Sequence, residues 1–180
     1  EVQRDVGIMP AGARLTVGND PVAHPLLSSG VDYKLNQVVE LRGTGAALPA
    51  GFKFGDALSS ELVSTLTLNP SLLGKDKVAN LEIFSNHAAL VREALRAPQG
   101  GSVHITAWAV TVGADIEARS GSIVLDADRN ALPPGSSPSS SDPLNVVVAD
   151  GVKFSARGAW VNELPGVPAG SADVALVHGG

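Results

Sequence analysis

Two short segments of the chain, 20 residues apart, share one pattern: Gly101-Ser-Val-His-Ile-Thr-Ala107 and Gly121-Ser-Ile-Val-Leu-Asp-Ala127. Each begins with Gly-Ser, continues with apolar residues at every second position and ends in alanine. Such alternation is typical of a β-strand with one buried face. A strand-length motif that recurs after about 20 residues is typical of strands stacked in successive coils. The repeat therefore predicts a parallel β-helix.

The same pattern occurs before residue 101. Leu81, Ile83 and Ser85 precede the matching positions of the first segment by 22 residues. If the segments stack in parallel, equivalent residues of adjacent coils lie about 4.8 Å apart. Three columns of inward residues are then expected: Leu81, Val103 and Ile123; Ile83, Ile105 and Leu125; and, where the wall turns, Ser85, Ala107 and Ala127.

A second strand type lies between the repeated segments. Ala114-Asp-Ile-Glu-Ala-Arg119 recurs as Val152-Lys-Phe-Ser-Ala-Arg157, and a Val-x-Val step precedes each copy, at 110–112 and 146–148. An insertion at 130–143 accounts for the larger gap, and its Pro- and Ser-rich composition predicts a loop outside the packed coils. Each coil is therefore expected to contain at least two strands with apolar residues inside and polar residues outside.

The remaining elements are shorter. Alternation predicts strands at 13–18, 35–42, 61–68 and 79–85. At 86–97 the period changes, because apolar residues recur at helical spacing between a potential N-cap and a proline that ends the helix. The residues concerned are Ala88, Val91, Ala94 and Leu95, with Asn86 as N-cap and Pro98 as stop. We expect a short helix there that protrudes between coils, and a weaker one at 56–63.

Composition is consistent with a layered β-structure. Of 180 residues, 44% are hydrophobic but only 4% are aromatic, so small and branched side chains fill the interior. The 20 glycines and 12 prolines indicate many turns. A formal net charge of −5 argues against binding nucleic acid, which requires a basic surface. The absence of cysteine excludes disulfides, thiolate chemistry and cysteine-ligated zinc.

The chain divides into two parts. Residues 1–50 contain N-terminal strands and loops, which form the first coils or a cap, and residues 51–180 contain β-helix coils with the inserted loop 130–143. No apolar run reaches the roughly 18 residues of a membrane-spanning segment, so no membrane span is expected. The first residues lack the apolar region of a signal peptide, and we expect the chain to be a piece of a larger protein.

Several stretches resemble a known family. Residues 149–162, Ala-Asp-Gly-Val-Lys-Phe-Ser-Ala-Arg-Gly-Ala-Trp-Val-Asn, the shorter 114–119 and Gly121-Ser-Ile-Val-Leu125 are similar to passenger regions of filamentous haemagglutinin-type two-partner-secretion exoproteins. Segments 51–55 and 59–62 are also comparable, and the similarity is best over 100–165. The resemblance implies an internal segment of a virulence-associated adhesin with a right-handed β-helix. It also implies export through an outer-membrane partner transporter, and a secreted or cell-surface location.

Carboxylates near strand ends are the candidates for catalysis or metal binding. Asp126-Ala-Asp-Arg-Asn130 begins like a calcium loop, but Ala131 and Ser137 replace its glycine and glutamate, so calcium is not expected. Some parallel β-helices cleave acidic polysaccharides, and paired carboxylates on one strand face suit acid–base chemistry. The groups concerned are Asp115, Glu117, Asp126 and Asp128, with Arg119 and Arg129. No His or Lys accompanies them on a second matching strand, so we interpret them as a charged outer wall.

The histidines and tryptophans are the remaining candidates. His24, His87, His104 and His178 lack ligand spacing, so no metal site is expected. His104 is predicted to face outward beside Thr106. Trp108 and Trp160 end comparable strands and are the candidate binding residues, since an indole stacks on sugar rings. The commoner role of such a tryptophan is to cover the corner of a coil.

These features predict an all-β protein, a right-handed parallel β-helix (solenoid) with protruding loops and one short helix. We expect no catalytic activity and no cofactor. The expected function is structural and adhesive: a stiff rod presents segments 130–143 and 86–97 to a glycan or protein on a host-cell or bacterial surface. Two alternatives remain open. One is a polysaccharide-degrading or carbohydrate-binding β-helix, and the other is an antiparallel two-sheet sandwich in which the repeat is coincidental.

Overall fold

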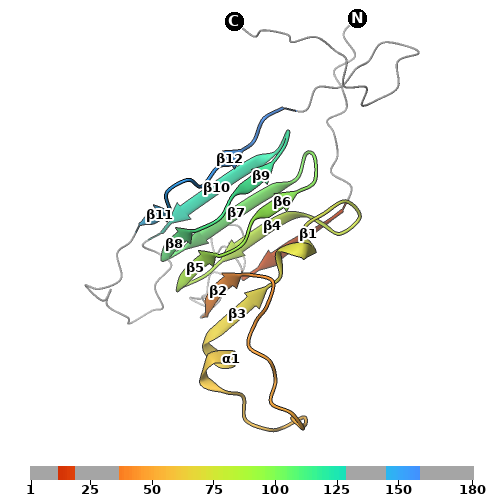
Figure 1. The fold of residues 1–180 in the computed structure, drawn as a ribbon, viewed down its shortest axis with the longest axis vertical. Coiled ribbons are helices and arrows are strands. Elements are labelled where there is room, and N and C mark those ends of the chain that lie inside the picture. The colour runs from red at the N-terminus through yellow and green to blue at the C-terminus, as the bar shows by residue number, and fades with distance from the viewer. Residues whose placement is uncertain (1–11, 19–36, 129–144, 159–180) are drawn as a thin grey trace, which may run out of the picture.

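The computed structural model describes residues 12–18, 37–128 and 145–158, which form three parallel β-sheets (Figure 1). The first sheet contains, in spatial order, β1 (Ala13–Val17), β4 (Val78–Phe84), β7 (Ser102–Ala107) and β10 (Ser122–Ala127). The second contains β11 (Val146–Val148), β8 (Ala109–Val112), β5 (Ala88–Val91), β2 (Val38–Leu41) and β3 (Thr65–Leu68). The third contains β12 (Phe154–Ser155), β9 (Ile116–Ala118) and β6 (Leu95–Ala97).

The described part is therefore all-β, as expected, and every strand pair is parallel. From β4 onward the chain visits the three sheets in a fixed order: β4, β5, β6; then β7, β8, β9; then β10, β11, β12. Each strand pairs with the corresponding strand of the next set. The antiparallel sandwich is wrong, because β7 and β10 pair in parallel.

Two of the three predicted inward columns are confirmed residue by residue, and in the third only Ala107 and Ala127 are paired. Leu81 pairs with Val103, which pairs with Ile123, and Ile83, Ile105 and Leu125 form the second column. The structure extends both columns to β1, where Leu15 pairs with Leu81 and Val17 with Ile83. The middle members of the columns are completely buried, and burial of each such aliphatic side chain stabilises the fold by about 1.5–3 kcal/mol.

The second strand series is also confirmed. Val146 and Val148 pair with Val110 and Val112, and Phe154 pairs with Ile116. The predicted loop at 130–143 connects β10 to β11 in the sequence and lies outside the described residues.

The predicted helix at 86–97 is wrong. This segment contains β5 and β6, and Ala89, Val91 and Leu95 are completely buried in the core. Their inward positions alternate strictly, as do those of the other strands. The outward positions include Ala88 and Leu90, which are half-buried. These apolar residues on the outer face obscure the period of two in the sequence and produce an apparent helical spacing.

A short helix does form before β3, overlapping the region 56–63 where the weaker helix is predicted. α1 (Ser60–Ser64) begins at the N-cap Ser59, and β3 follows directly, so only the second half of the expected strand at 61–68 is extended. β3 lies on the side of β2 that faces away from β5, with Leu66 and Leu68 opposite Val39 and Leu41. Figure 1 shows β3 and α1 at one end of the sheets, opposite β10 and β12.

The Gly-Ser step has a packing explanation. A Cβ atom on Gly101 would collide with the carbonyl oxygen of Ala79, and one on Gly121 would collide with the carbonyl oxygen of Gly101. The chain therefore enters the first sheet at a point where the backbones before neighbouring strands are in contact. Glycine is required there because no side chain fits between these backbones.

Candidate functional site

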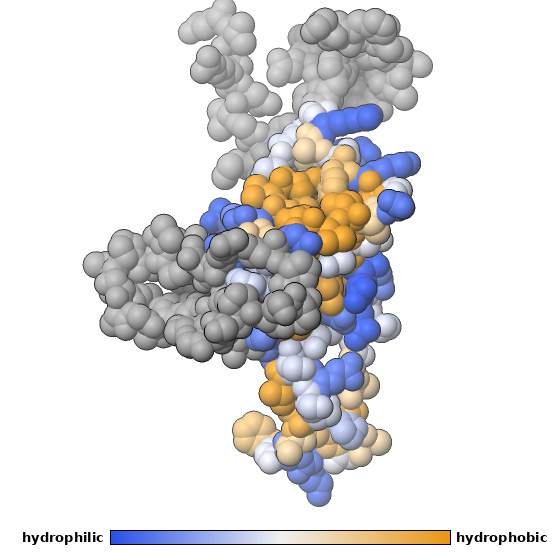
Figure 2. Space-filling model, turned by 90° about the vertical axis from the view of Figure 1, so that its left-hand side faces the viewer, coloured by the Kyte–Doolittle hydropathy of each residue, from blue (hydrophilic) through white to orange (hydrophobic). Residues whose placement is uncertain are grey.

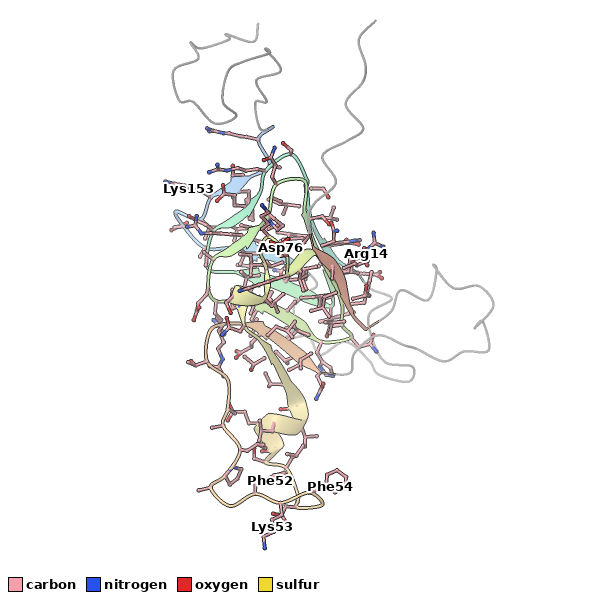
Figure 3. All side chains as sticks on the ribbon, turned by 90° about the vertical axis from the view of Figure 1, so that its right-hand side faces the viewer. Arg14, Phe52, Lys53, Phe54, Asp76 and Lys153 are labelled. Atoms are coloured by element: carbon pink, nitrogen blue, oxygen red, sulfur yellow. The ribbon has the colours of Figure 1, made fainter. Side chains whose placement is uncertain are left out.

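The segment 43–64 forms an arm that projects from the β3 end of the sheets (Figure 3). It carries large apolar side chains that are open to solvent: Leu48, Phe54, Leu58 and Val63. Phe54 is fully exposed, and Figure 3 places it with Phe52 and Lys53 at the far end of the arm. An exposed apolar cluster of this kind is typical of an interaction surface.

Two consecutive turns hold the tip of the arm. The Phe52 N–H donates to the Pro49 carbonyl at 3.0 Å, and the Asp56 N–H donates to the Lys53 carbonyl at 3.0 Å. The Asp56 carboxylate also accepts the Lys53 N–H at 2.7 Å. Gly51 and Gly55 have φ angles of +80° and +99°, which side-chain-bearing residues rarely adopt in such turns. The exposure of Phe54 is therefore set by backbone hydrogen bonds.

Polar contacts fix the base of the arm to the second sheet. The Asn69 side chain donates to the Gly43 carbonyl at 2.8 Å. Arg42 lies 2.9 Å from the Glu40 carboxylate and 3.7 Å from that of Glu61 on α1. Arg42, Glu61 and Asn69 border a cavity of about 350 Å³ between the arm and β3, which is also lined by Thr67. The arm is thus anchored at its base, and Phe54 at its tip is exposed to solvent.

A second candidate site is a charged groove on the outside of the third sheet. It has a volume of about 210 Å³, and its polar lining consists of Arg96, Asp115, Glu117, Lys153 and Ser155. The prediction from the sequence included Asp115 and Glu117 but not the two cations. Arg96 lies directly opposite Glu117 on the neighbouring strand, 21 residues earlier. The coil spacing could have revealed Arg96, had 95–97 been interpreted as a strand.

The carboxylates in this groove are engaged by neighbouring groups. Glu117 accepts from Arg96 at 3.3 Å and forms a close ion pair with Arg119. Asp115 accepts the Lys153 backbone N–H at 2.8 Å. Glu117 is thus paired with two cations, whereas Asp115 accepts one backbone N–H, and these contacts connect β6, β9 and the start of β12. Neither carboxylate is left without a partner, as acid–base chemistry would require.

The structure separates the predicted carboxylates into two places: Asp115 and Glu117 line the third-sheet groove, whereas Asp126 lies elsewhere. Asp126 lies on β10 of the first sheet, whereas Glu117 lies on β9 of the third. Arg129 lies outside the described residues. Among the described residues, no three His, Asp or Glu side chains are close enough together to hold a metal ion.

The predicted aromatic and histidine residues are placed as follows. Trp108 follows β7 at a corner and is only 7% exposed, so its ring offers little surface for stacking on a sugar. Trp160, His24 and His178 lie outside the described residues. His104 is half-buried on the outer side of β7, where it contacts Thr106 at 3.3 Å and the edge of Phe84.

Comparisons with protein-family models, with curated proteins and with solved structures give no match to this chain. In the described ranges, no helix has the length and apolar character that crossing a bilayer requires. The function must therefore be argued from the geometry alone.

Proposed function

We propose that this chain is a non-catalytic, adhesive segment of a filamentous haemagglutinin-type exoprotein. Its three sheets form a right-handed parallel β-helix, and its role is to hold projecting segments at fixed positions along a stiff rod. The observation that carries the proposal is the register: strands 20 to 22 residues apart pair position by position in the first sheet.

The order in which the chain visits the sheets supports the β-helix. Each passage from β4 to β7, or from β7 to β10, is a crossover between parallel neighbours of one sheet. Such crossovers are right-handed in about 98% of cases. Each coil contacts only its neighbours, so stiffness along the stack comes from repeated parallel pairing.

The outer surface supports a role without catalysis. Charged side chains there are paired along the stacking direction: Arg14 with Glu82, Arg92 with Glu40, and Arg96 with Glu117. Charged outer walls of this kind prevent sheets of different molecules from pairing. The polysaccharide-cleaving alternative would require free carboxylates, whereas both acids of the third-sheet groove are occupied by basic or N–H donors.

The arm supports adhesion. Segment 86–97 was expected to protrude as a recognition surface, but its strands are part of the sheets. The arm at 43–64 takes that role in the proposal, because it combines a polar anchor at its base with a fully exposed Phe54 at its tip. Its partner is an apolar area on a glycan or protein of a host-cell or bacterial surface.

The adhesive part of the proposal is tested by binding of the purified chain to host cells, bacterial cells and a glycan array. Phe54→Ser is expected to abolish binding. Val124→Ser, a matched change at an exposed valine of β10, is expected to leave it intact. Binding that is equal in both variants and the unchanged chain would contradict the proposal. Turnover of a uronate polymer that Glu117→Gln abolishes would favour the enzymatic alternative.

The export part is tested in cells that produce the parent exoprotein with its partner transporter. Ile105→Asp places a charge in the fully buried column, whereas Val124→Asp places the same charge on the outer face of the adjacent strand. If coils that fold at the cell surface assist export, the first variant accumulates inside the cell and the second is released normally. Normal release of both variants would refute this mechanism.

A further inference from the structure

The two ends of the sheets carry complementary apolar features. At one end, the arm at 43–64 projects beyond β3 and holds the fully exposed Phe54 at its tip. At the other end, β10, β11 and β12 each pair on one side only within the described residues. Figure 1 shows the arm and these three strands on opposite sides of the sheets. An apolar projection therefore lies at one end and a set of unpaired strands at the other.

The β10 end contains an apolar cavity. Its volume is about 400 Å³, and the described residues that line it are Ile123, Leu125, Phe154 and Ala156. The first three pair with completely buried residues of neighbouring strands, namely Val103, Ile105 and Ile116. In the cavity itself, Ile123 and Leu125 are only half-buried and Phe154 is exposed. The cavity therefore opens onto positions that belong to the core in the neighbouring strands.

The second sheet is also apolar at this end. Val146, Val147 and Val148 on β11 are all exposed. Figure 2, which views the side of the molecule where β11 lies, shows hydrophobic residues gathered toward the β10 end, with further ones on the arm. Exposed apolar patches of this kind are typical of interaction sites. The two ends therefore both have the character of a contact surface.

The tip of the arm fits the cavity in size and in chemistry. A cavity of about 150 Å³ lined by aliphatic and aromatic side chains takes up a benzene molecule. The larger cavity at the β10 end therefore has room for the phenyl ring of Phe54 and part of its turn. Backbone hydrogen bonds between residues 49 and 56 already hold this turn, so insertion of the ring orders little additional chain.

The charges of the chain favour a specific contact at these two places. A net charge of −5 disfavours unspecific association between copies. The exposed Lys53, however, is next to Phe54 at the tip of the arm, and the exposed Asp126 follows Leu125 on β10. An arm that enters the cavity of another molecule thus brings a cation toward a carboxylate.

We propose that the arm of one copy inserts Phe54 into the cavity at the β10 end of a second copy. Arm and cavity lie at opposite ends of one molecule, so the contact is heterologous and copies add head to tail. The inference goes beyond the proposed function, because adhesion requires only a free arm. The copy at one end of every open assembly keeps its arm free.

Sedimentation velocity of the purified chain tests the contact, at concentrations up to about 1 mM because so small an interface is weak. The unchanged chain is expected to form dimers and longer oligomers as its concentration rises. Phe54→Ser removes the ring, and Ala156→Glu adds a charge at an exposed residue of the cavity. Each variant should weaken association by about tenfold or more, since the contact depends on burial of one aromatic side chain.

Two matched variants control for effects of the substitutions themselves. Val63→Ser changes an exposed residue of the same arm on α1, away from its tip. Val124→Glu adds the same charge as Ala156→Glu on the outer face of β10, outside the cavity lining. Both should associate like the unchanged chain. Association that survives Phe54→Ser or Ala156→Glu as well as it survives these controls would overturn the inference.

A mixture of the two weakened variants distinguishes a head-to-tail contact from a symmetric one. The arm of Ala156→Glu and the cavity of Phe54→Ser are both intact, so the equimolar mixture should form dimers and no longer oligomers. Each variant alone should remain monomeric at the same concentration. Absence of dimers in the mixture, or a monomeric unchanged chain across the whole concentration range, would overturn the inference.

Binding to cells and to a glycan array separates this inference from the proposed function. Ala156→Glu keeps an intact arm and should bind like the unchanged chain. If the unchanged chain is monomeric but its binding still requires Phe54, the head-to-tail contact is wrong and adhesion stands. If the copies associate as predicted but bind neither cells nor glycans, the adhesive function fails and the contact stands.

Discussion

Gly121 lies directly over Gly101, so closely that a Cβ atom on Gly121 would overlap the Gly101 carbonyl oxygen. This contact explains why the repeated motif begins with glycine. Glycine is needed there for packing and not for an unusual backbone angle, since neither Gly101 nor Gly121 has a positive φ angle.

Gly121→Ala should therefore destabilise the chain, because the added methyl group forces adjacent coils apart. Overpacking of this kind costs about 1–3 kcal/mol or more of unfolding free energy. Gly158→Ala is the control, since no atom lies within 4 Å of the position that its Cβ would take. Urea unfolding measures both variants. An equal effect of the two substitutions would show that the corner contact does not exist.

Ile105 tests the buried column. Ile105 is completely buried between Ile83 and Leu125. Ile105→Ala should therefore lower the unfolding free energy by about 2–5 kcal/mol. Val124→Ala, on the exposed face of the neighbouring strand, should change it by about 0.5 kcal/mol or less. Thermal or urea unfolding of both variants measures the two losses. A larger loss of stability in Val124→Ala than in Ile105→Ala would show that the buried and exposed positions are assigned wrongly.

Ser85 occupies the corner at the end of β4 and is completely buried. Its hydroxyl donates to the Gln37 carbonyl at 2.7 Å and accepts the His87 N–H at 3.0 Å, so it connects the first sheet to the start of β2. Ser85→Ala leaves both backbone groups without this partner and should cost about 1–3 kcal/mol. If Ser85→Ala is as stable as the unchanged chain or more stable, the Ser85 hydroxyl does not stabilise this corner.

Glu117 should matter little for stability. It pairs with Arg96 and Arg119, whose side chains are 72% and 66% exposed, and exposed ion pairs contribute about 0–1 kcal/mol. Glu117→Gln keeps the shape and removes the charge, so we expect a loss below about 1 kcal/mol that shrinks in high salt. A salt-insensitive loss as large as that of Ile105→Ala would contradict the description of this face as a solvated wall.

The alternating residues were sufficient to predict the strand pairing. Val103 with Ile123 and Ile116 with Phe154 were both expected from spacing alone, because parallel strands paired in register place equivalent residues side by side. The sequence signal is clear there because most outward residues, such as His104, Thr106 and Glu117, are polar, although Val124 is apolar. Parallel pairing, register and the buried columns follow from it.

Two features could not be found in this way. Residues 86–97 were assigned to a helix because Ala88, Val91, Ala94 and Leu95 recur at helical spacing. Ala88 and Leu90 are apolar on the outer face, so the local spacing did not reveal the period of two. The arm at 43–64 and the position of β3 beside β2 depend on a long connection that breaks the coil spacing. Lys153 could have been placed beside Asp115 from the match of 152–157 to 114–119, but its position in the third-sheet groove was not predicted.

The central claim is that strands one coil apart lie parallel and in register. It is tested most directly by NMR in the isotopically labelled chain, through inter-strand amide-to-α-proton nuclear Overhauser effects between β7 and β10. The account predicts contacts that link the neighbourhood of Val103 with that of Ile123, and Ile105 with Leu125, in the same order along both strands. Contacts in the reversed order, with Val103 near Asp126 and Ile105 near Val124, would show antiparallel pairing and contradict it.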